Sequence, residues 1–211
     1  MKTILITLIF IFGLLILSTG QTKTDEPAKM PVWTEVDRKY LLDNLIRSKE
    51  EIIAETRNLT KEQWNFKESP DRWSINQIVE HIDLWELLFM HEISQALAKE
   101  SDPNFKYFSL DSVFLDQDPK GLKKNNALEY TKPFSFAVPL GNNEGKNNVT
   151  WLTTMRNESI DYLKKETKNI RLQYDYCSGV NVHQYYIMIY SHTDRHLRQL
   201  RKVKAHPNYP K

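Results

Sequence analysis

The sequence predicts an all-α protein, a bundle of four long helices. Four segments carry apolar residues three and four positions apart with charged residues between them, which is the period of an amphipathic helix. Substantial connections join these segments, and no stretch shows a β-strand pattern of comparable strength. The predicted helices cover about residues 33–59, 74–99, 149–170 and 182–205.

The first two helices are predicted from their apolar stripes and from one capping signal. Ser74 and Gln77 form a capping box, in which the serine oxygen accepts from the backbone N–H three residues on and the glutamine reaches back. Residues 60–73 form the connection between the two helices. The stripes consist of Val36, Tyr40, Leu41, Leu42, Leu45, Ile46, Ile52 and Ile53, and of Ile75, Ile78, Val79, Ile82, Trp85, Leu88 and Phe89.

The last two helices follow a long connection. Gly179 breaks the chain before the fourth helix, Asn181 is a plausible N-cap residue, and Pro207 stops the helix. Residues 101–148 mix aromatic residues with proline, glycine and asparagine and are too long for a bare loop. We expect them to form short helical turns packed over one end of the bundle, where a lid is one role for them. The predicted stripe of the third helix is Trp151, Leu152, Met155, Tyr162 and Leu163.

The N-terminus has the three-part pattern of a secretory signal peptide. Lys2 provides the positive charge, residues 4–17 form an almost unbroken apolar run, and small residues precede Gln21. A membrane anchor is the alternative, but a bilayer span needs roughly 20 apolar residues and this run is shorter. We therefore expect an exported protein, periplasmic or secreted, without stable membrane insertion after cleavage. The predicted divisions are a signal peptide (1–20), a linker (21–32) and the bundle domain (33–206).

Composition limits the classes of function. The 29 basic and 27 acidic side chains give a net charge of +2, which argues against a nucleic-acid partner because such binders usually carry a strong basic excess. The basic residues between 195 and 204 are expected to lie on a solvated outer face. Cys177 is the single cysteine, so no internal disulfide forms. We expect it to be an ordinary residue near a loop, with a reactive thiol as the alternative.

Two histidines lie on the predicted inner face of the fourth helix. At about 100° per residue, His196 lies about 40° from His192, and Gln199 and Tyr185 lie within about 20° of it. Side chains four residues apart have Cβ atoms roughly 5–6 Å apart, so two such imidazoles can reach one metal ion. Thr193 stands where a His-Glu-x-x-His protease has its glutamate, and that position lies about 100° off the ligand face.

A third histidine on an apolar face comes from the second helix. His81 has Ile78, Leu84 and Trp85 around it at helical spacing, and it completes a three-histidine site if the two helices are neighbours. Three protein ligands with an open position are typical of a catalytic rather than a structural zinc site. The alternative is that these are hydrogen-bonded core histidines without a metal.

The remaining histidines are weaker candidates. His183 lies opposite His192 on the helical wheel and is expected to face solvent, and His206 lies in the tail. His91 lies at the edge of its helix face. Together with Glu158 and Cys177 it is a candidate fourth ligand, and a fourth ligand would indicate a closed site.

Two stretches resemble the DinB-like superfamily, whose members are four-helix bundles and in many cases bind a metal through three histidines. These are NLTKEQWNFKESPDRWSINQIVEHI and SHTDRHLRQLRKV, and the resemblance extends over about residues 33–205. In that family a Trp-Ser-Ile/Leu entry leads to a histidine seven residues after the serine, and the last helix carries His-x-x-x-His-x-x-Gln. The matching residues here are Trp73, Ser74, Ile75, His81, His192, His196 and Gln199.

The resemblance implies that His81, His192 and His196 bind a divalent transition metal, for which we favour zinc or nickel. A bound metal lowers the pKa of water or of a thiol, so this helix needs no general base. Characterised relatives include bacillithiol- and mycothiol-dependent transferases and isomerases, although such thiols belong to the reducing cytosol and this chain is expected to be exported. Family members often pair through their helices, so a homodimer is one expectation.

We therefore expect a metal-dependent hydrolase or transferase that acts on a small molecule. The alternatives are a non-catalytic periplasmic metal-binding or interaction module and a bundle that keeps its histidines without a metal. Arg195 lies nearest the inner stripe and is a candidate for steering an anionic substrate. The residues expected to contact the ligands or the substrate are Gln199, Trp85, Tyr185 and Arg195.

Overall fold

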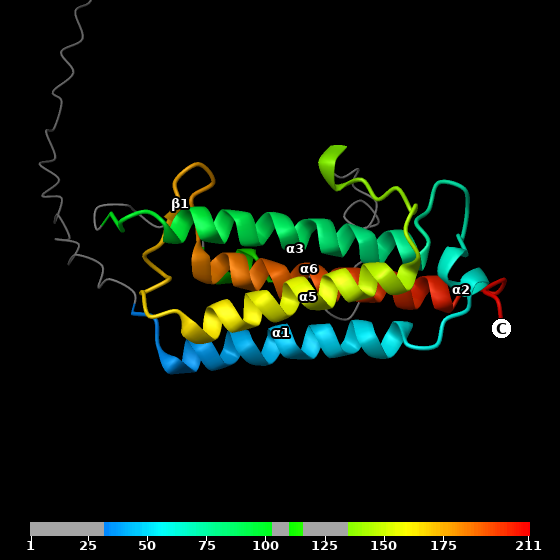
Figure 1. Cartoon of the computed structure of the whole chain (residues 1–211), viewed down its shortest axis with the longest axis horizontal. Helices are drawn as coiled ribbons and strands as arrows, with labels where there is room; N and C mark the ends of the chain where they lie inside the picture. Colours follow the sequence, from blue (N-terminus) through cyan, green and yellow to red (C-terminus); the bar gives the residue numbers. More distant parts are fainter. Residues whose placement is uncertain (1–31, 103–109, 116–134) are drawn as a thin grey trace, which may run out of the picture. The chain divides into compact units, whose positions relative to one another are not determined.

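The computed structural model describes residues 32–102, 110–115 and 135–211, which belong to one compact unit and are mostly helical (Figure 1). This confirms the predicted helical class. The predicted signal peptide lies outside the described residues, and no described helix is long and apolar enough to cross a membrane. The elements are α1 (Glu35–Thr56), α2 (Lys61–Asn65), α3 (Ile75–Leu97), η1 (Asp111–Val113), η2 (Ser135–Ala137), α5 (Gly145–Lys165), β1 (Tyr174–Asp175), β2 (Val180–Asn181) and α6 (Val182–Lys204).

Capping boxes begin four of the helices. Ser74 caps α3 and Asn181 caps α6, both as predicted, and each pairs with a glutamine three residues on. The short helix α2 was not predicted; it lies in the predicted connection and is capped by Thr60. The antiparallel pairing of β1 with β2 was not predicted either. In the turn between these strands Gly179 adopts a left-handed conformation with a φ of 73°.

The four long helices pack side by side, α1 and α3 each against both α5 and α6. Contacts fix their directions. Arg47 of α1 meets Asp194 of α6, and Arg201 further along α6 meets Glu55 further along α1, so these two helices run parallel. Asn148 near the start of α5 meets Asn76 near the start of α3, and Lys168 just after α5 meets Leu97 at the end of α3, so α3 and α5 are parallel. α3 runs antiparallel to α6 (Figure 1).

A parallel neighbour requires a long connection, because the chain must return along the bundle before α5 can start. With a rise of about 1.5 Å per residue, the 23-residue α3 is roughly 35 Å long. In the described parts of the connection, η1 contacts Arg171 near the start of α6, while Pro139 accepts a hydrogen bond from Gln77 at the start of α3. The expectation that this segment packs over one end of the bundle is therefore wrong, since it reaches both ends.

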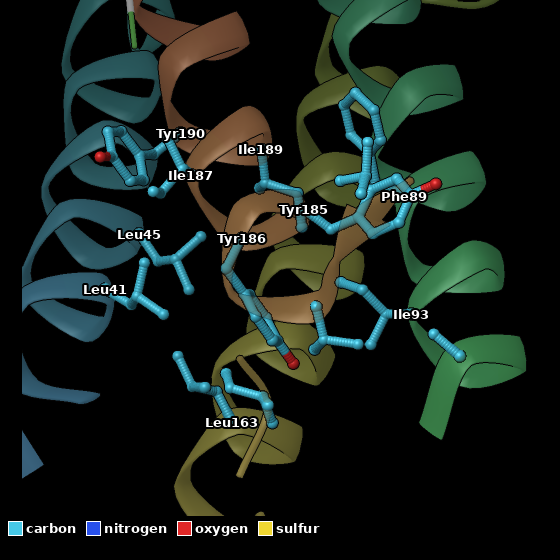
Figure 2. Close-up of a cluster of buried hydrophobic side chains, with 14 of the residues drawn as sticks. Leu41, Leu45, Phe89, Ile93, Leu163, Tyr185, Tyr186, Ile187, Ile189 and Tyr190 are labelled. Carbon is cyan, nitrogen blue, oxygen red and sulfur yellow. The ribbon is translucent and has the colours of Figure 1, made fainter. Parts of the chain in front are cut away.

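Two clusters of apolar side chains fill the interior. In the first, Leu41 of α1, Ile93 of α3 and Leu163 of α5 surround Tyr186 of α6, and Tyr185 points toward α3 (Figure 2). The second cluster, nearer the start of α3, contains Trp64 of the short α2. Both clusters draw on α3 and α6, so these two helices are held against each other along their length.

The predicted stripe of α5 is wrong in part. Trp151 is 59 % exposed and Tyr162 is 45 % exposed, whereas Arg156 and Ser159 are buried. The periodicity of apolar residues did not identify the inward face of α5, because that face is polar at its centre. A buried arginine has the sequence appearance of a surface residue.

The Arg156 guanidinium uses all of its N–H groups inside the bundle. It donates to both Glu86 carboxylate oxygens of α3 at 2.7 Å, and to the Thr193 hydroxyl of α6 at 2.9 Å. On the α1 side it donates to the Ser48 hydroxyl at 2.6 Å and to the Leu45 carbonyl at 3.0 Å. One side chain therefore ties all four long helices together, with both charges of the ion pair removed from solvent.

Part of the basic run at the end of α6 pairs with acidic residues of α1. Arg201 donates to Glu51 at 2.8 Å and Glu55 at 2.7 Å, and Lys204 also reaches Glu55. These two cations thus neutralise neighbouring carboxylates, which corrects the view of a merely solvated face.

We predict that Arg156→Met lowers the free energy of unfolding by about 3–5 kcal/mol, because the Glu86 carboxylate is left buried without a counter-charge. Chemical denaturation followed by circular dichroism measures this loss. Arg156→Met combined with Glu86→Leu should recover most of it, and the exposed Arg57→Met should change stability by less than about 0.5 kcal/mol. A loss of under about 1 kcal/mol in the single variant would contradict the assigned role.

Candidate metal centre

Three imidazoles meet between α3 and α6. His81 comes from α3, and His192 and His196 come from successive turns of α6; one ring nitrogen from each lies within 4.8 Å of the other two. The ring centroids of His81 are 5.2 Å from His192 and 4.7 Å from His196. The convergence that helical spacing predicted is therefore present, because α3 and α6 are direct neighbours.

Hydrogen bonds at the outer nitrogens orient two of the rings. His81 Nδ1 lies 2.7 Å from the carbonyl oxygen of Ala137 in η2, and His196 Nδ1 lies 2.8 Å from Gln199 Oε1. Both partners are acceptors, so each Nδ1 carries the proton and each Nε2 presents a lone pair. The Nε2 atoms of His192 and His196 are only 3.0 Å apart, so they point at a common position.

Burial keeps these rings neutral. It lowers the pKa of His81 to about 4, against the small opposing effect of the hydrogen bond to Ala137. Burial likewise holds the pKa of His192 and of His196 well below the usual range, and the positive charge of Arg195 acts in the same direction on all three. Neutral imidazole is the form that binds metals, so the site is prepared for a cation without first losing protons.

The donor set fits a divalent transition metal. Imidazole nitrogens suit zinc, nickel, copper and iron, and three of them here can contact one ion. Among the described residues, no carboxylate, thiol or further imidazole joins the group. His91, Glu158 and Cys177, the candidate fourth ligands, all lie outside it.

Aromatic rings enclose the three histidines. Trp73 lies against His81, with ring centroids 4.7 Å apart, and stacks over His196 at 6.3 Å. On the other side, Trp85 is 5.7 Å from His192. The structure thus places the predicted Trp85 beside the site and adds Trp73, a residue of the Trp-Ser-Ile motif.

The other predicted contacts differ in position. Gln199 touches the site directly through His196. Tyr185 lies two turns before His192, where its hydroxyl donates to Asp175 at 2.9 Å and its ring is 6.2 Å from Phe89. Arg195 acts on the histidines through its charge and is partly buried.

His183 is buried, which overturns the expectation that it faces solvent. Its Nε2 accepts from Arg171 at 3.0 Å and lies 3.4 Å from an Asp111 oxygen. The helical wheel failed because η1 and the chain before β1 cover this turn of α6 on the side away from the bundle axis. His183 takes no part in the three-histidine group.

Thr193, which replaces the protease glutamate, also has a structural partner. Its hydroxyl accepts from Arg156 and donates to the Ile189 carbonyl at 2.9 Å. The residue between the two clustered histidines of α6 therefore joins the buried ion pair and not the three-histidine group.

A family model described as DinB superfamily matches residues 44–200, a span that contains all three histidines. No curated protein and no solved structure matches the chain.

We predict that Gln199→Leu weakens metal binding about 10- to 100-fold, because His196 loses the acceptor that fixes its ring and tautomer. Zinc affinity measured by competition with a chromophoric chelator checks this. Gln199→Glu keeps an acceptor oxygen at the same place and should retain most of the affinity. Equal affinity in Gln199→Leu and the unaltered protein would remove Gln199 from the site.

Proposed function

Because the chain belongs to the DinB superfamily and brings three histidines together, we propose that it is an exported metal-dependent enzyme, a hydrolase or a transferase of a small molecule. One observation carries the proposal. Three neutral imidazoles, two with their outer nitrogens held by acceptors, direct nitrogen atoms to one place. A structural core gains nothing from burying three such rings together, since each has polar atoms that require partners.

His81, His192 and His196 would hold the ion, and zinc or nickel is the proposed metal. When bound, such an ion supplies Lewis acidity and lowers the pKa of a ligand at its open position. The chain's own contribution is to orient the rings through Ala137 and Gln199. The aromatic wall of Trp73 and Trp85 limits the access of water.

Export is supported by the signal-peptide pattern of residues 1–20, and it favours a hydrolase over a transferase that depends on a cytosolic thiol. We also propose the four-helix arrangement of the DinB type, with residues 101–148 as its insert. Pairing into a homodimer and the absence of a nucleic-acid partner belong to the same proposal.

A non-catalytic metal-binding module is the second candidate. A closed site would need a fourth protein ligand, and none of the described His, Cys, Asp or Glu side chains lies within reach of the three histidines. The open donor set therefore supports the enzyme over the storage or structural site.

We predict that the purified protein contains about one equivalent of zinc or nickel, and that His192→Ala combined with His196→Ala removes it, because one imidazole cannot retain the ion. Elemental mass spectrometry measures the metal, and circular dichroism verifies the fold of the variant. His91→Ala, an exposed histidine of the same α3, is the matched control and should keep the metal. Absence of metal from the unaltered protein after incubation with either ion would contradict the proposed function.

A further inference from the structure

A cavity of about 520 Å³ lies along the α3–α6 seam between Trp85 and the β1–β2 hairpin, and none of the three histidines is among its lining residues. On α3 its lining includes Trp85, Leu88, Glu92 and Gln95, which follow His81 by 4, 7, 11 and 14 residues. These intervals keep all of them on the helix face that carries His81. The cavity, which we call the seam groove, therefore lies along the same face of α3 that carries His81.

The lining residues of α6 also lie on the helix face that carries its two clustered histidines. Tyr185 and Met188 line the groove seven and four residues before His192, again on the ligand face. Trp85 and Phe89 belong to the groove and also contact the His192 ring, with centroids 5.7 Å and 6.2 Å away. Figure 2 shows Tyr185 beside Phe89 on this side of the core. The groove therefore ends at the aromatic rings of Trp85 and Phe89, which lie against the His192 ring.

The groove is elongated and changes in polarity along its length. From Trp85 to Gln95 it follows α3 for 10 residues, about 15 Å at 1.5 Å per residue, and Lys99 lies just beyond the end of the helix. The half next to the histidines is apolar, with Trp85, Leu88, Phe89 and Met188. The half next to the hairpin carries charged side chains, so the groove fits an extended molecule with an apolar middle and a polar far end.

Two of the charged side chains at the hairpin end of the groove, Asp175 and Lys99, have partners in the structure. The Asp175 carboxylate accepts from Ser178 Oγ at 2.6 Å, from the Tyr185 hydroxyl at 2.9 Å and from a backbone N–H. Lys99 lies over the ring of Tyr176, with its ammonium nitrogen 5.6 Å from the centroid.

Glu92 is different. It is half-buried in the groove, and no described residue forms a hydrogen bond or ion pair with its carboxylate. It lies one helical turn beyond Phe89 and seven residues before Lys99, which follows the end of α3. A partly desolvated carboxylate without a cation is unfavourable, so a bound cation would gain both charge pairing and the release of that cost.

We propose that the seam groove binds an elongated amine, with its apolar chain against Trp85, Phe89 and Met188 and its ammonium group at Glu92. Aromatic faces attract cations, which adds to the carboxylate. A ligand ending in a carboxylate would instead meet the like charges of Glu92 and Asp175. The assignment of this amine as the substrate rests on the proposed function, because only a metal at the histidines would act on the end of the chain opposite the ammonium.

Calorimetric titration of the full chain with hexylammonium, hexanol and hexanoate tests the inference. Hexylammonium should bind at least about tenfold more tightly than the other two, and affinity should rise about fourfold per methylene from butyl- to octylammonium. Glu92→Gln should weaken hexylammonium about tenfold and leave hexanol unchanged. Glu158→Gln, an exposed glutamate of α5 outside the groove, makes the same charge change and should have no effect.

Glu92→Lys provides a second variant, in which the preference should turn to hexanoate. Hexanoate binding as tightly as hexylammonium to the unaltered protein, or an unchanged preference in both Glu92 variants, would overturn the inference.

The proposed metal site and the proposed amine site can be tested independently. The His192→Ala/His196→Ala variant should lose the metal and still prefer hexylammonium. If the protein binds no metal but keeps the Glu92-dependent preference, the amine site is supported and the proposed enzyme is contradicted. If it contains one equivalent of metal and shows no preference, the metal site is supported and the amine site is overturned.

Discussion

The buried Arg156–Glu86 ion pair is the constraint on which the arrangement of the helices depends. Its cost of desolvation is offset only if every N–H of the guanidinium and both carboxylate oxygens find partners, which happens in one register of α1, α3, α5 and α6. Glu86 follows Trp85 on α3, and Thr193 follows His192 on α6. Satisfying the ion pair therefore also sets His81 opposite the two histidines of α6. The three-histidine group thus takes its geometry from a polar contact that contains none of the three histidines.

The direction of the helices adds a second constraint. Because α3 and α5 are parallel, the chain between them must travel the length of the bundle, and its last described part passes the start of α3. There the Ala137 carbonyl meets His81 Nδ1. The connection that the topology requires thus supplies the acceptor that α3 and α6 do not offer to this ring, and it becomes part of the site.

These constraints explain which features the sequence could predict. His192, His196 and Gln199 needed only the period of one helix, and His81 needed one further assumption, that α3 and α6 are neighbours. The inward face of α5 was missed because Arg156 and Ser159 are buried through partners on other helices. His183 was missed for the same reason, since its partners Arg171 and Asp111 come from other segments. Periodicity detects burial against apolar neighbours and does not detect burial against a specific polar partner.

The proposed metal centre and the seam groove have opposite electrostatic requirements, and their separation satisfies both. Near the histidines, the charge of Arg195 disfavours protonated imidazole and favours electron-rich groups at the ion. Beyond Phe89, Glu92 favours a cation. A substrate whose electron-rich end reached the proposed ion and whose ammonium reached Glu92 would be bound in one orientation, because the reversed pose places each end beside a like charge. The apolar middle contributes affinity in either direction, so orientation comes from the two ends alone.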